Sequence, residues 1–133
     1  MTLVDTTVWV DFFRGRNTPQ VRSLERLLRE GEDICTCGLV LTEVLQGIAR
    51  EDEYSRTLSR FQSLIFLPMD RDTFVQAAGL YRQLRSQGIT IRKPVDCMIA
   101  SVAIQHGVAL LHNDQDYDHI EKHCGLKVLR TVG

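Results

Sequence analysis

Short apolar segments alternate along this chain with longer stretches of helical periodicity. The segments with strand character are residues 3–4, 34–36, 64–67, 108–111 and 127–129. The helical stretches between them are residues 6–14, 18–30, 41–48, 51–62, 71–87, 94–106 and 115–123. Strands that alternate with helices indicate a mainly parallel sheet, because each helix carries the chain back to begin the next strand. We therefore predict an α/β fold, a three-layer sandwich in which helices flank a mainly parallel central sheet.

The chain length favours one domain. A chain of 133 residues, of which 44% are hydrophobic, suffices for one core, so we expect a single domain over residues 1–133. The longest apolar run, residues 98–104, is shorter than the roughly 18 residues that cross a bilayer. The first apolar stretch has acids and no basic residue before it, unlike a secretory signal. We expect a cytoplasmic protein that stays out of membranes and keeps its cysteines as free thiols.

Aspartates stand where the predicted strands end. Asp5 and Asp114 each follow a predicted strand, and Asp96 lies in the first turn of a predicted helix. Parallel strands end at one edge of a sheet, which is where open α/β folds bind their ligands. Each aspartate alone could instead be a helix cap. Because Asp116 and Asp118 add further acid next to Asp114, we predict an acidic cluster at this edge.

Glu43 is a further candidate, and its position leaves two interpretations open. The apolar residues of its predicted helix share one face, at Leu41, Val44, Leu45 and Ile48. Glu43 points away from that face, as an exposed glutamate would. However, its own side of the helix is also apolar, which is unusual for a surface in water. We therefore keep Glu43 among the candidate site residues.

A cluster of carboxylates is unfavourable unless a positive charge lies among them. Oxygen ligands of this kind select Mg²⁺ or Mn²⁺. Such an ion can activate water and stabilise the leaving oxygen of a phosphodiester. Arg92 and Lys93 precede a helix start, where cations oppose the helix dipole. They indicate either a phosphate held near Asp96 or an ordinary exposed pair.

The acids lie in four short segments with a characteristic order and spacing. The segments are residues 3–12 (LVDTTVWVDF), 42–47 (TEVLQG), 95–100 (VDCMIA) and 113–117 (NDQDY). In this order they resemble the four motifs of PIN-domain proteins, specifically the VapC-type toxins, over the full chain. The resemblance implies a PIN fold, which is a parallel sheet flanked by helices with an acidic pocket at the strand ends.

The resemblance also implies roles for individual residues. The expected metal ligands are Asp5, Asp96, Asp114 and Asp116. The expected catalytic quartet is Asp5, Glu43, Asp96 and Asp114. Thr6 matches a hydroxyl that orients the substrate, and together with the two cations discussed above the expected substrate contacts are Thr6, Arg92 and Lys93.

The same resemblance implies an Mg²⁺-dependent endoribonuclease in which Mn²⁺ can substitute. Members of the family cleave RNA, often tRNA or rRNA, and a cognate antitoxin protein neutralises them. We therefore expect RNA, an antitoxin and a second copy of this chain as partners. The sequence departs from the family pattern at two places. His112-Asn113 stands where Thr or Ser is frequent, and Tyr117 stands where Phe is common.

The first predicted helix carries more apolar surface than one core contact needs. Its apolar residues spread over more than half of its circumference, at Val8, Trp9, Val10, Phe12 and Phe13. One interpretation is that Trp9 and Phe13 help to form a groove for the antitoxin or for a second copy. The other is that the helix is simply buried on two sides.

Other functions are alternatives. A PIN-fold interaction module without catalysis would be expected to lack motif acids, and none is missing. His119 and His123 lie one helical turn apart, but the segment is not a zinc-protease motif and no third ligand is placed nearby. A phosphoryl-transfer receiver or phosphatase is disfavoured by the single aspartate of the first motif. The chain has no Walker loop and no glycine-rich dinucleotide loop.

Overall fold

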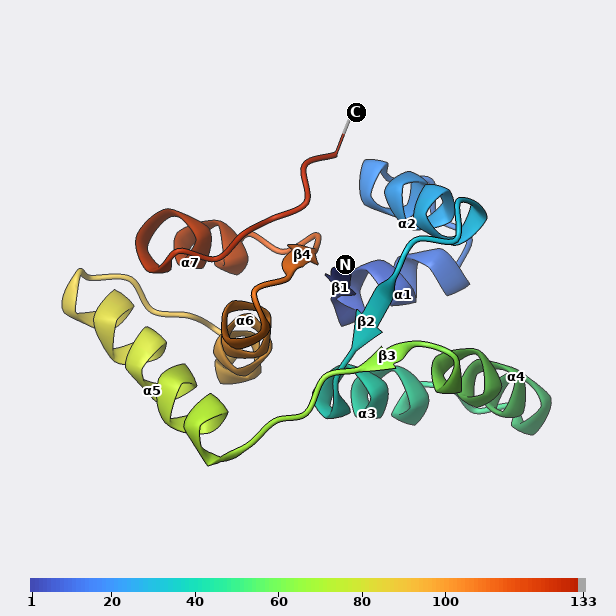
Figure 1. The fold of residues 1–133 in the computed structure, drawn as a ribbon, viewed down its shortest axis with the longest axis horizontal. Helices are drawn as coiled ribbons and strands as arrows, with labels where there is room; N and C mark the ends of the chain where they lie inside the picture. The colour runs from blue at the N-terminus through green and yellow to red at the C-terminus, as the bar shows by residue number, and fades with distance from the viewer. Residues whose placement is uncertain (132–133) are drawn as a thin grey trace.

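Four parallel strands form the central sheet of the computed structural model, which describes residues 1–131 (Figure 1). The strands are β1 (Thr2–Val4), β2 (Ile34–Thr36), β3 (Ile65–Phe66) and β4 (Ala109–Leu111). The helices are α1 (Thr6–Phe13), α2 (Pro19–Arg29), α3 (Gly38–Gln46), α4 (Glu51–Gln62), α5 (Arg71–Ser86), α6 (Pro94–His106) and α7 (Asp116–Cys124). The strand order is β3-β2-β1-β4, and every pairing is parallel. This confirms the predicted α/β class.

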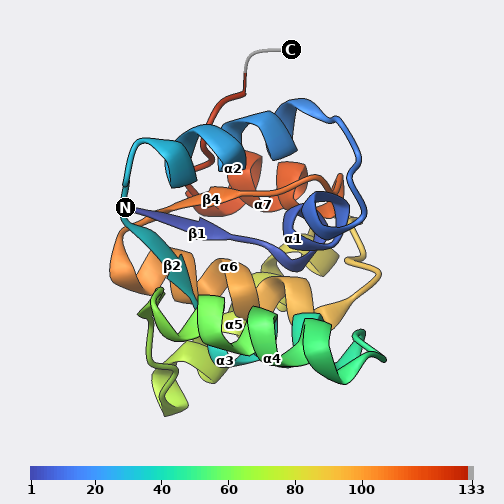
Figure 2. The same ribbon diagram turned by 90° about the vertical axis from the view of Figure 1, so that its right-hand side faces the viewer.

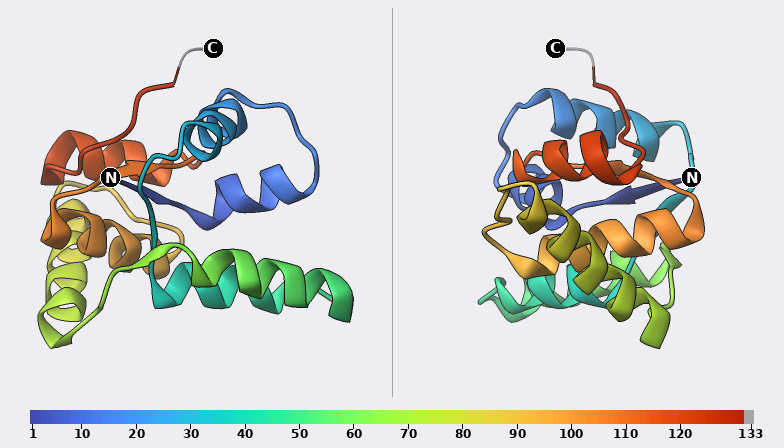
Figure 3. Two further views of the ribbon diagram at one scale, coloured as in Figure 1. Left: turned by 45° about the vertical axis from the view of Figure 1, so that its right-hand side comes forward. Right: turned by 90° about the vertical axis from the view of Figure 1, so that its left-hand side faces the viewer.

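Helices cover both faces of the sheet, as a three-layer sandwich requires. Figure 1 shows α1 and α2 on one side of the row of strands and α5, α6 and α7 on the other. In Figure 2 the strands lie between α2 and α6. Figure 3 shows α5 crossing over α6, and α5 also contacts α7. Since β1 and β4 are parallel neighbours, their carboxyl ends come out at the same edge of the sheet.

Capping residues explain where the helices nearest that edge begin and end. Asp5 caps α1 by accepting a hydrogen bond from the backbone N–H of Thr7. Pro94 occupies the first turn of α6, where a missing N–H costs nothing. Gly107 ends α6 at a φ of 65°, a left-handed conformation that glycine adopts without strain. These two helix starts place Asp5 and Asp96 beside the strand ends.

Two predicted strands differ in the structure. The predicted strand 127–129 is wrong as a regular strand, because the structure has only an isolated bridge between Leu110 and Val128. Two backbone hydrogen bonds of 2.9 Å hold it, from Leu110 N–H to Lys127 and from Leu129 N–H to Leu110. The predicted strand 64–67 shrinks to two residues. Only its inner side is paired, with β2, so β3 is the edge of the sheet.

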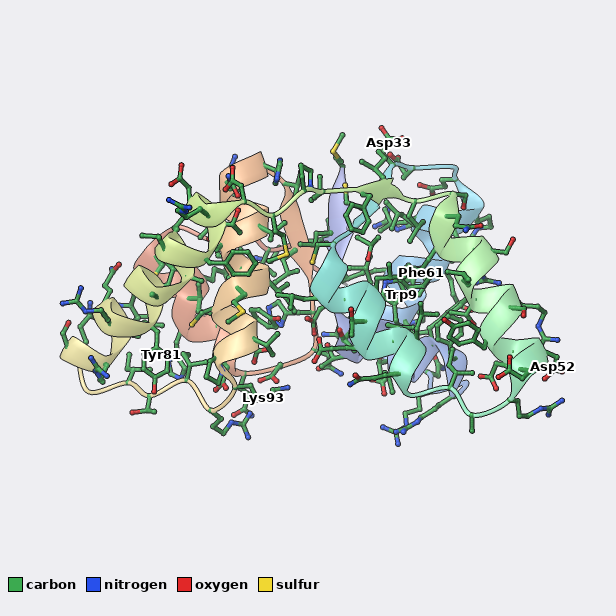
Figure 4. All side chains as sticks on the ribbon, turned by 90° about the horizontal axis from the view of Figure 1, so that it is seen from below. Trp9, Asp33, Asp52, Phe61, Tyr81 and Lys93 are labelled. Carbon is green, nitrogen blue, oxygen red and sulfur yellow. The ribbon has the colours of Figure 1, made fainter. Side chains whose placement is uncertain are left out.

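The apolar surplus on α1 is explained largely by burial. Trp9 is fully buried, and its ring centroid lies 4.8 Å from that of Phe61 on α4 (Figure 4). Phe13 stacks on the other side at 5.9 Å and stays half-buried. The interpretation that Trp9 lines a surface groove is therefore wrong, because Trp9 is fully buried and packs against Phe61 of α4. Phe13 remains accessible.

No helix in residues 1–131 combines the length and the apolar character needed to span a membrane. The single domain expected over residues 1–133 stays a prediction, and its last two residues lie outside the described part of the chain.

Replacing Trp9 by alanine tests the role of this contact in the core. We expect Trp9→Ala to lower the free energy of unfolding by about 3–5 kcal/mol, because it removes a large buried ring and leaves a cavity. Urea unfolding followed by circular dichroism measures the change. Val75→Ala is the control, since Val75 is 65% exposed on α5 and should change stability little. A Trp9→Ala protein as stable as the control would contradict the assignment of Trp9 to the core.

Candidate active site

A polar cavity of about 410 Å³ opens at the carboxyl edge of the sheet. It brings together residues from the N-termini of α1 and α6, from the middle of α3 and from the loop after β4. Five of the residues that the sequence singled out line this cavity, namely Asp5, Thr6, Glu43, Lys93 and Asp96. Asp114, Asp116 and Arg92 lie next to it rather than in its lining. The cavity is thus the meeting point of all four sequence segments.

Asp5 is held by hydrogen bonds to both carboxylate oxygens. It is only 2% exposed. Its Oδ2 accepts from the Thr7 hydroxyl at 2.6 Å and from the Thr7 backbone N–H at 3.1 Å. Its Oδ1 accepts from the buried hydroxyl of Tyr117 at 2.7 Å. Asp5 is therefore both a helix cap and a carboxylate that lines the cavity beside the group formed by Asp96, Asp114 and Asp116, so capping does not exclude a place at the site.

Asp96 is the most strained member of the cluster in electrostatic terms. It is 3% exposed, and its Oδ2 has no hydrogen-bond partner among residues 1–131. The Lys93 ammonium lies 4.0 Å from this oxygen, beyond hydrogen-bonding distance. Burial raises the pKa of Asp96 to about 7; nearby Lys93 offsets part of this rise, while Asp5 and Asp114 add to it. An orphaned buried carboxylate oxygen of this kind calls for a cation.

Asp114 and Asp116 complete an oxygen cluster with Asp96. One carboxylate oxygen from each of the three lies within 4.8 Å of the others. Lys93 lies 3.1 Å from Asp114, and Arg92 lies 3.3 Å from Asp114 and 3.4 Å from Asp116. Burial pushes the pKa of Asp114 up, but the Asp116 N–H and the two cations outweigh it and hold the pKa below its usual value. Arg92 and Lys93 therefore act as counter-ions of the acids in this structure.

Glu43 enters the site because the buried face of α3 differs from the predicted one. The sequence placed Leu41, Leu45 and Ile48 on the core face with Val44, but the buried residues of α3 are Val40 and Val44. Glu43 borders that face and lines the cavity. Its Oε1 accepts a hydrogen bond of 2.8 Å from the Thr6 hydroxyl. The apolar surroundings of Glu43 in the sequence were the signal that it is not a solvent-facing residue.

The donor set suits a divalent metal ion that prefers oxygen. The cluster offers carboxylates alone, and Asp96 Oδ2, which accepts no hydrogen bond within residues 1–131, can accept a cation without losing one. By contrast, His119, His123 and Cys124 do not form a group of metal-ligating atoms in the part of the chain that the structure describes. The site therefore fits a hard divalent cation better than zinc.

Several residues at the site were missed by the sequence analysis. Thr7 and Tyr117 hold Asp5, and the rim of the cavity carries further polar residues, namely Asp11, Arg14, Arg16 and Asn113. Position within a motif was the only signal for Thr7 and Tyr117. Hydrophobic periodicity could not have shown that Arg14 and Arg16, which follow α1, lie at the rim of the cavity.

His112 precedes the fourth segment, where the sequence departs from the Thr or Ser that is frequent in the resembling family. Its Nδ1 accepts the backbone N–H of Asp114 at 3.2 Å, and its ring packs on Tyr117 with centroids 4.8 Å apart. Burial lowers the pKa of His112. The neutral imidazole thus shapes the turn that carries Asp114.

Comparison with known proteins agrees with this geometry. A family model described as PIN domain matches residues 2–123. VapC ribonuclease Mb1587 of Mycobacterium bovis is 38% identical to this chain over 130 residues, which is 96% of each chain. Ribonuclease VapC11 of Mycobacterium tuberculosis shows the same identity and coverage. The solved structure of VapBC2 from Rickettsia felis, bound to a promoter DNA fragment, covers 98% of both chains with a TM-score of 0.75; at 20% identity it supports the fold.

The raised pKa of Asp96 leads to a stability test. The pKa is about 7 in the folded protein and about 4 in an unfolded chain. The folded state is therefore penalised as pH rises from about 4 to about 7, by roughly 2–4 kcal/mol, and the penalty is absent at lower pH. We expect Asp96→Asn to melt several degrees above the wild type at pH 8 in EDTA, and the gap to close near pH 4.

Thermal melts at both pH values, with EDTA and with Mg²⁺, measure this effect. Added Mg²⁺ should narrow the gap, because it binds the folded wild type. If Asp96 instead served mainly as a partner of the helix dipole, Asp96→Asn would be less stable by about 0.3–1 kcal/mol in both buffers. That result would contradict the clustered-carboxylate interpretation.

Proposed function

Because this chain belongs to the PIN-domain family and, within it, to the VapC-type ribonucleases, we propose that it is a metal-dependent endoribonuclease toxin that a cognate antitoxin inhibits. The observation that carries this proposal is the buried Oδ2 of Asp96, which has no hydrogen-bond partner in residues 1–131 and lies among neighbouring carboxylates in a polar cavity. Asp5, Asp96, Asp114 and Asp116 are the proposed metal ligands. We propose Mg²⁺ as the ion, with Mn²⁺ able to substitute, because both take carboxylate oxygens and suit phosphate chemistry.

The proposed reaction is hydrolysis of a phosphodiester, in which water adds to phosphorus and the bond to the leaving oxygen breaks. A bound divalent cation supplies the positive charge that activates water and stabilises the developing negative charge. Asp5 and Asp96, which line the cavity, would hold that cation. Glu43 is half-buried and oriented by Thr6 at 2.8 Å, so it is placed to accept the proton of the attacking water. In this scheme the Thr6 hydroxyl orients Glu43 by donating its proton, and the lone pairs of the Thr6 oxygen can accept a hydrogen bond from the substrate.

Cations on the rim give the cavity an affinity for phosphate. Arg14 and Arg16 lie at the end of α1, and Lys93 lies at the start of α6. Arginine binds phosphate oxygens in pairs, and lysine binds them as a point charge. Lys93 and Arg92 would exchange their contacts to Asp114 for contacts to RNA when a metal ion neutralises the acids. The substrate class proposed is RNA, with tRNA or rRNA as the first candidates, and we expect the protein to act in the cytoplasm.

A cleavage assay with purified protein tests the catalytic assignment. We expect Asp5→Asn and Asp96→Asn each to lower Mg²⁺-dependent RNA cleavage at least about 100-fold. Each substitution removes the charge of a proposed metal ligand, and loss of a residue that only supports a ligand already costs about 10–100-fold. Chelator should silence the wild type, and Mn²⁺ should restore it. Asp33→Asn is the matched control, since Asp33 is exposed at the start of β2, away from the cavity (Figure 4).

Cleavage at the wild-type rate by Asp96→Asn would contradict the assignment. The alternative of a catalytically inactive interaction module predicts that the wild type binds its antitoxin and cleaves no RNA under any metal condition.

A groove that leaves the active-site cavity is the proposed binding surface for the antitoxin. A second cavity of about 140 Å³ shares Val10, Arg14 and Glu43 with the first, and Phe13 also lines it. A third, of about 240 Å³, continues past Phe13 along α4. The three together run from the acids to the aromatic surface of α1. A segment bound there would cover the catalytic acids.

For the expected homodimer, we propose that the contact surface is the apolar hollow between α5 and α6, which Phe74 lines with 45% of its surface exposed.

Removing the Phe13 ring tests the proposed antitoxin groove. We expect Phe13→Ala to weaken antitoxin binding about tenfold or more, because a half-buried aromatic side chain that anchors an interface typically costs more than ~1 kcal/mol when it is truncated. Binding is measured by titrating purified antitoxin into the variant. Phe66→Ala is the control, since Phe66 is 55% exposed on β3 and lines none of the three cavities. Equal loss in both variants, or none in Phe13→Ala, would contradict the groove.

A further inference from the structure

The hydroxyl of Tyr117 lies between two of the proposed metal ligands. Tyr117 comes from α7, is fully buried, and reaches across to the N-termini of α1 and α6. Its oxygen lies 2.7 Å from Asp5 Oδ1 and 3.3 Å from Asp96 Oδ1. We infer that Tyr117 is a positioning residue, which sets the orientation of Asp5 and Asp96 for the metal ion. This inference deepens the proposed function and rests on it.

The ring of Tyr117 and its hydroxyl have separate surroundings. The ring packs on His112 and is enclosed by the core, as a phenylalanine ring would be. The hydroxyl instead faces two carboxylates, and its one proton can be donated to only one of them at a time. The shorter distance selects Asp5 as the acceptor. Packing alone therefore does not account for the oxygen.

Donation by Tyr117 completes the set of hydrogen bonds that fixes Asp5. Thr7 already occupies Asp5 Oδ2 with two hydrogen bonds. With Tyr117 on Oδ1, the carboxylate cannot rotate without losing a buried contact. Each carboxylate oxygen can accept more than one hydrogen bond or ligand, so Asp5 keeps a lone pair for a cation.

The position of Tyr117 also distinguishes the two oxygens of Asp96. Oδ1 faces the hydroxyl, while Oδ2 is the buried atom that has no hydrogen-bond partner in residues 1–131. The Tyr117 hydroxyl thus contacts the Oδ1 atoms of both aspartates and limits the rotation of both carboxylates. Groups that orient ligands in this way typically contribute 10–100-fold to metal affinity.

Metal binding by Tyr117→Phe tests this inference without relying on activity. The substitution removes one oxygen and keeps the ring. We expect the Kd for Mn²⁺, measured from the free-ion signal in electron paramagnetic resonance, to rise about tenfold or more. At saturating Mn²⁺, kcat for RNA cleavage should return to within a few-fold of the wild type, because the ligands themselves are intact. Tyr54→Phe is the control; its hydroxyl is on α4, away from the cavity lining, and its loss should change neither value.

The outcomes separate this inference from the proposed function. If Tyr117→Phe raises the Kd for Mn²⁺ while the wild type cleaves no RNA, the positioning role is supported and the ribonuclease assignment is overturned. An unchanged Kd would overturn the positioning role, whether or not cleavage falls. If Tyr117→Phe does not fold, Thr7→Val provides the second test, because it removes the other side-chain donor to Asp5 and should also raise the Kd. An unchanged Kd in that variant would overturn the inference at its premise, because it would show that the side-chain hydrogen bonds that fix Asp5 do not set the affinity for the metal ion.

Discussion

The burial of like charges at one edge of the sheet is the constraint on which the site depends. Parallel strands must all release the chain at the same edge, so acids placed after them are forced together. Asp5 and Asp96 are almost fully buried there. Burial deprives Asp96 of the solvation that water would give its charge, and Asp5 and Asp114 repel it to a smaller extent, which is why the pKa of Asp96 rises to about 7. The fold accepts this electrostatic cost in exchange for a point of concentrated negative charge.

The rest of the molecule limits that cost with buried hydrogen-bond donors and exposed cations. Thr7, Tyr117 and the N-terminus of α1 donate to Asp5 from rigid elements. Arg92 and Lys93 neutralise Asp114 from a loop and keep their side chains largely exposed. The donors to Asp5 fix the orientation of its carboxylate, whereas Arg92 and Lys93 supply positive charge from exposed side chains. This division lets the acids stay in place while their positive partners change.

The sequence predicted the fold and the identity of the acids better than the contacts among them. Most helix boundaries agree closely with the structure because the Asp5 cap and Pro94 in a first turn are local signals, whereas α3 begins at Gly38, three residues before its predicted start. The segment at residues 127–129 was predicted as a strand because it is apolar enough, but only Val128 bridges to the sheet. Trp9 and Glu43 needed tertiary context. Whether an apolar residue on α1 meets α4, or a glutamate borders a buried face of α3, depends on how helices distant in sequence pack together.

Asp5 combines two tasks, capping α1 and serving the acidic cluster, and this overlap shapes how the site can change during evolution. Asparagine caps a helix about as well as aspartate does, whereas alanine does not. A lineage that loses the chemistry can therefore pass through asparagine at this position while keeping its fold. A change to alanine is opposed twice, once by selection for the reaction and once by selection for a stable first helix. The second pressure remains when the first has ended, so alanine stays disfavoured at this position even in a lineage that no longer carries out the reaction.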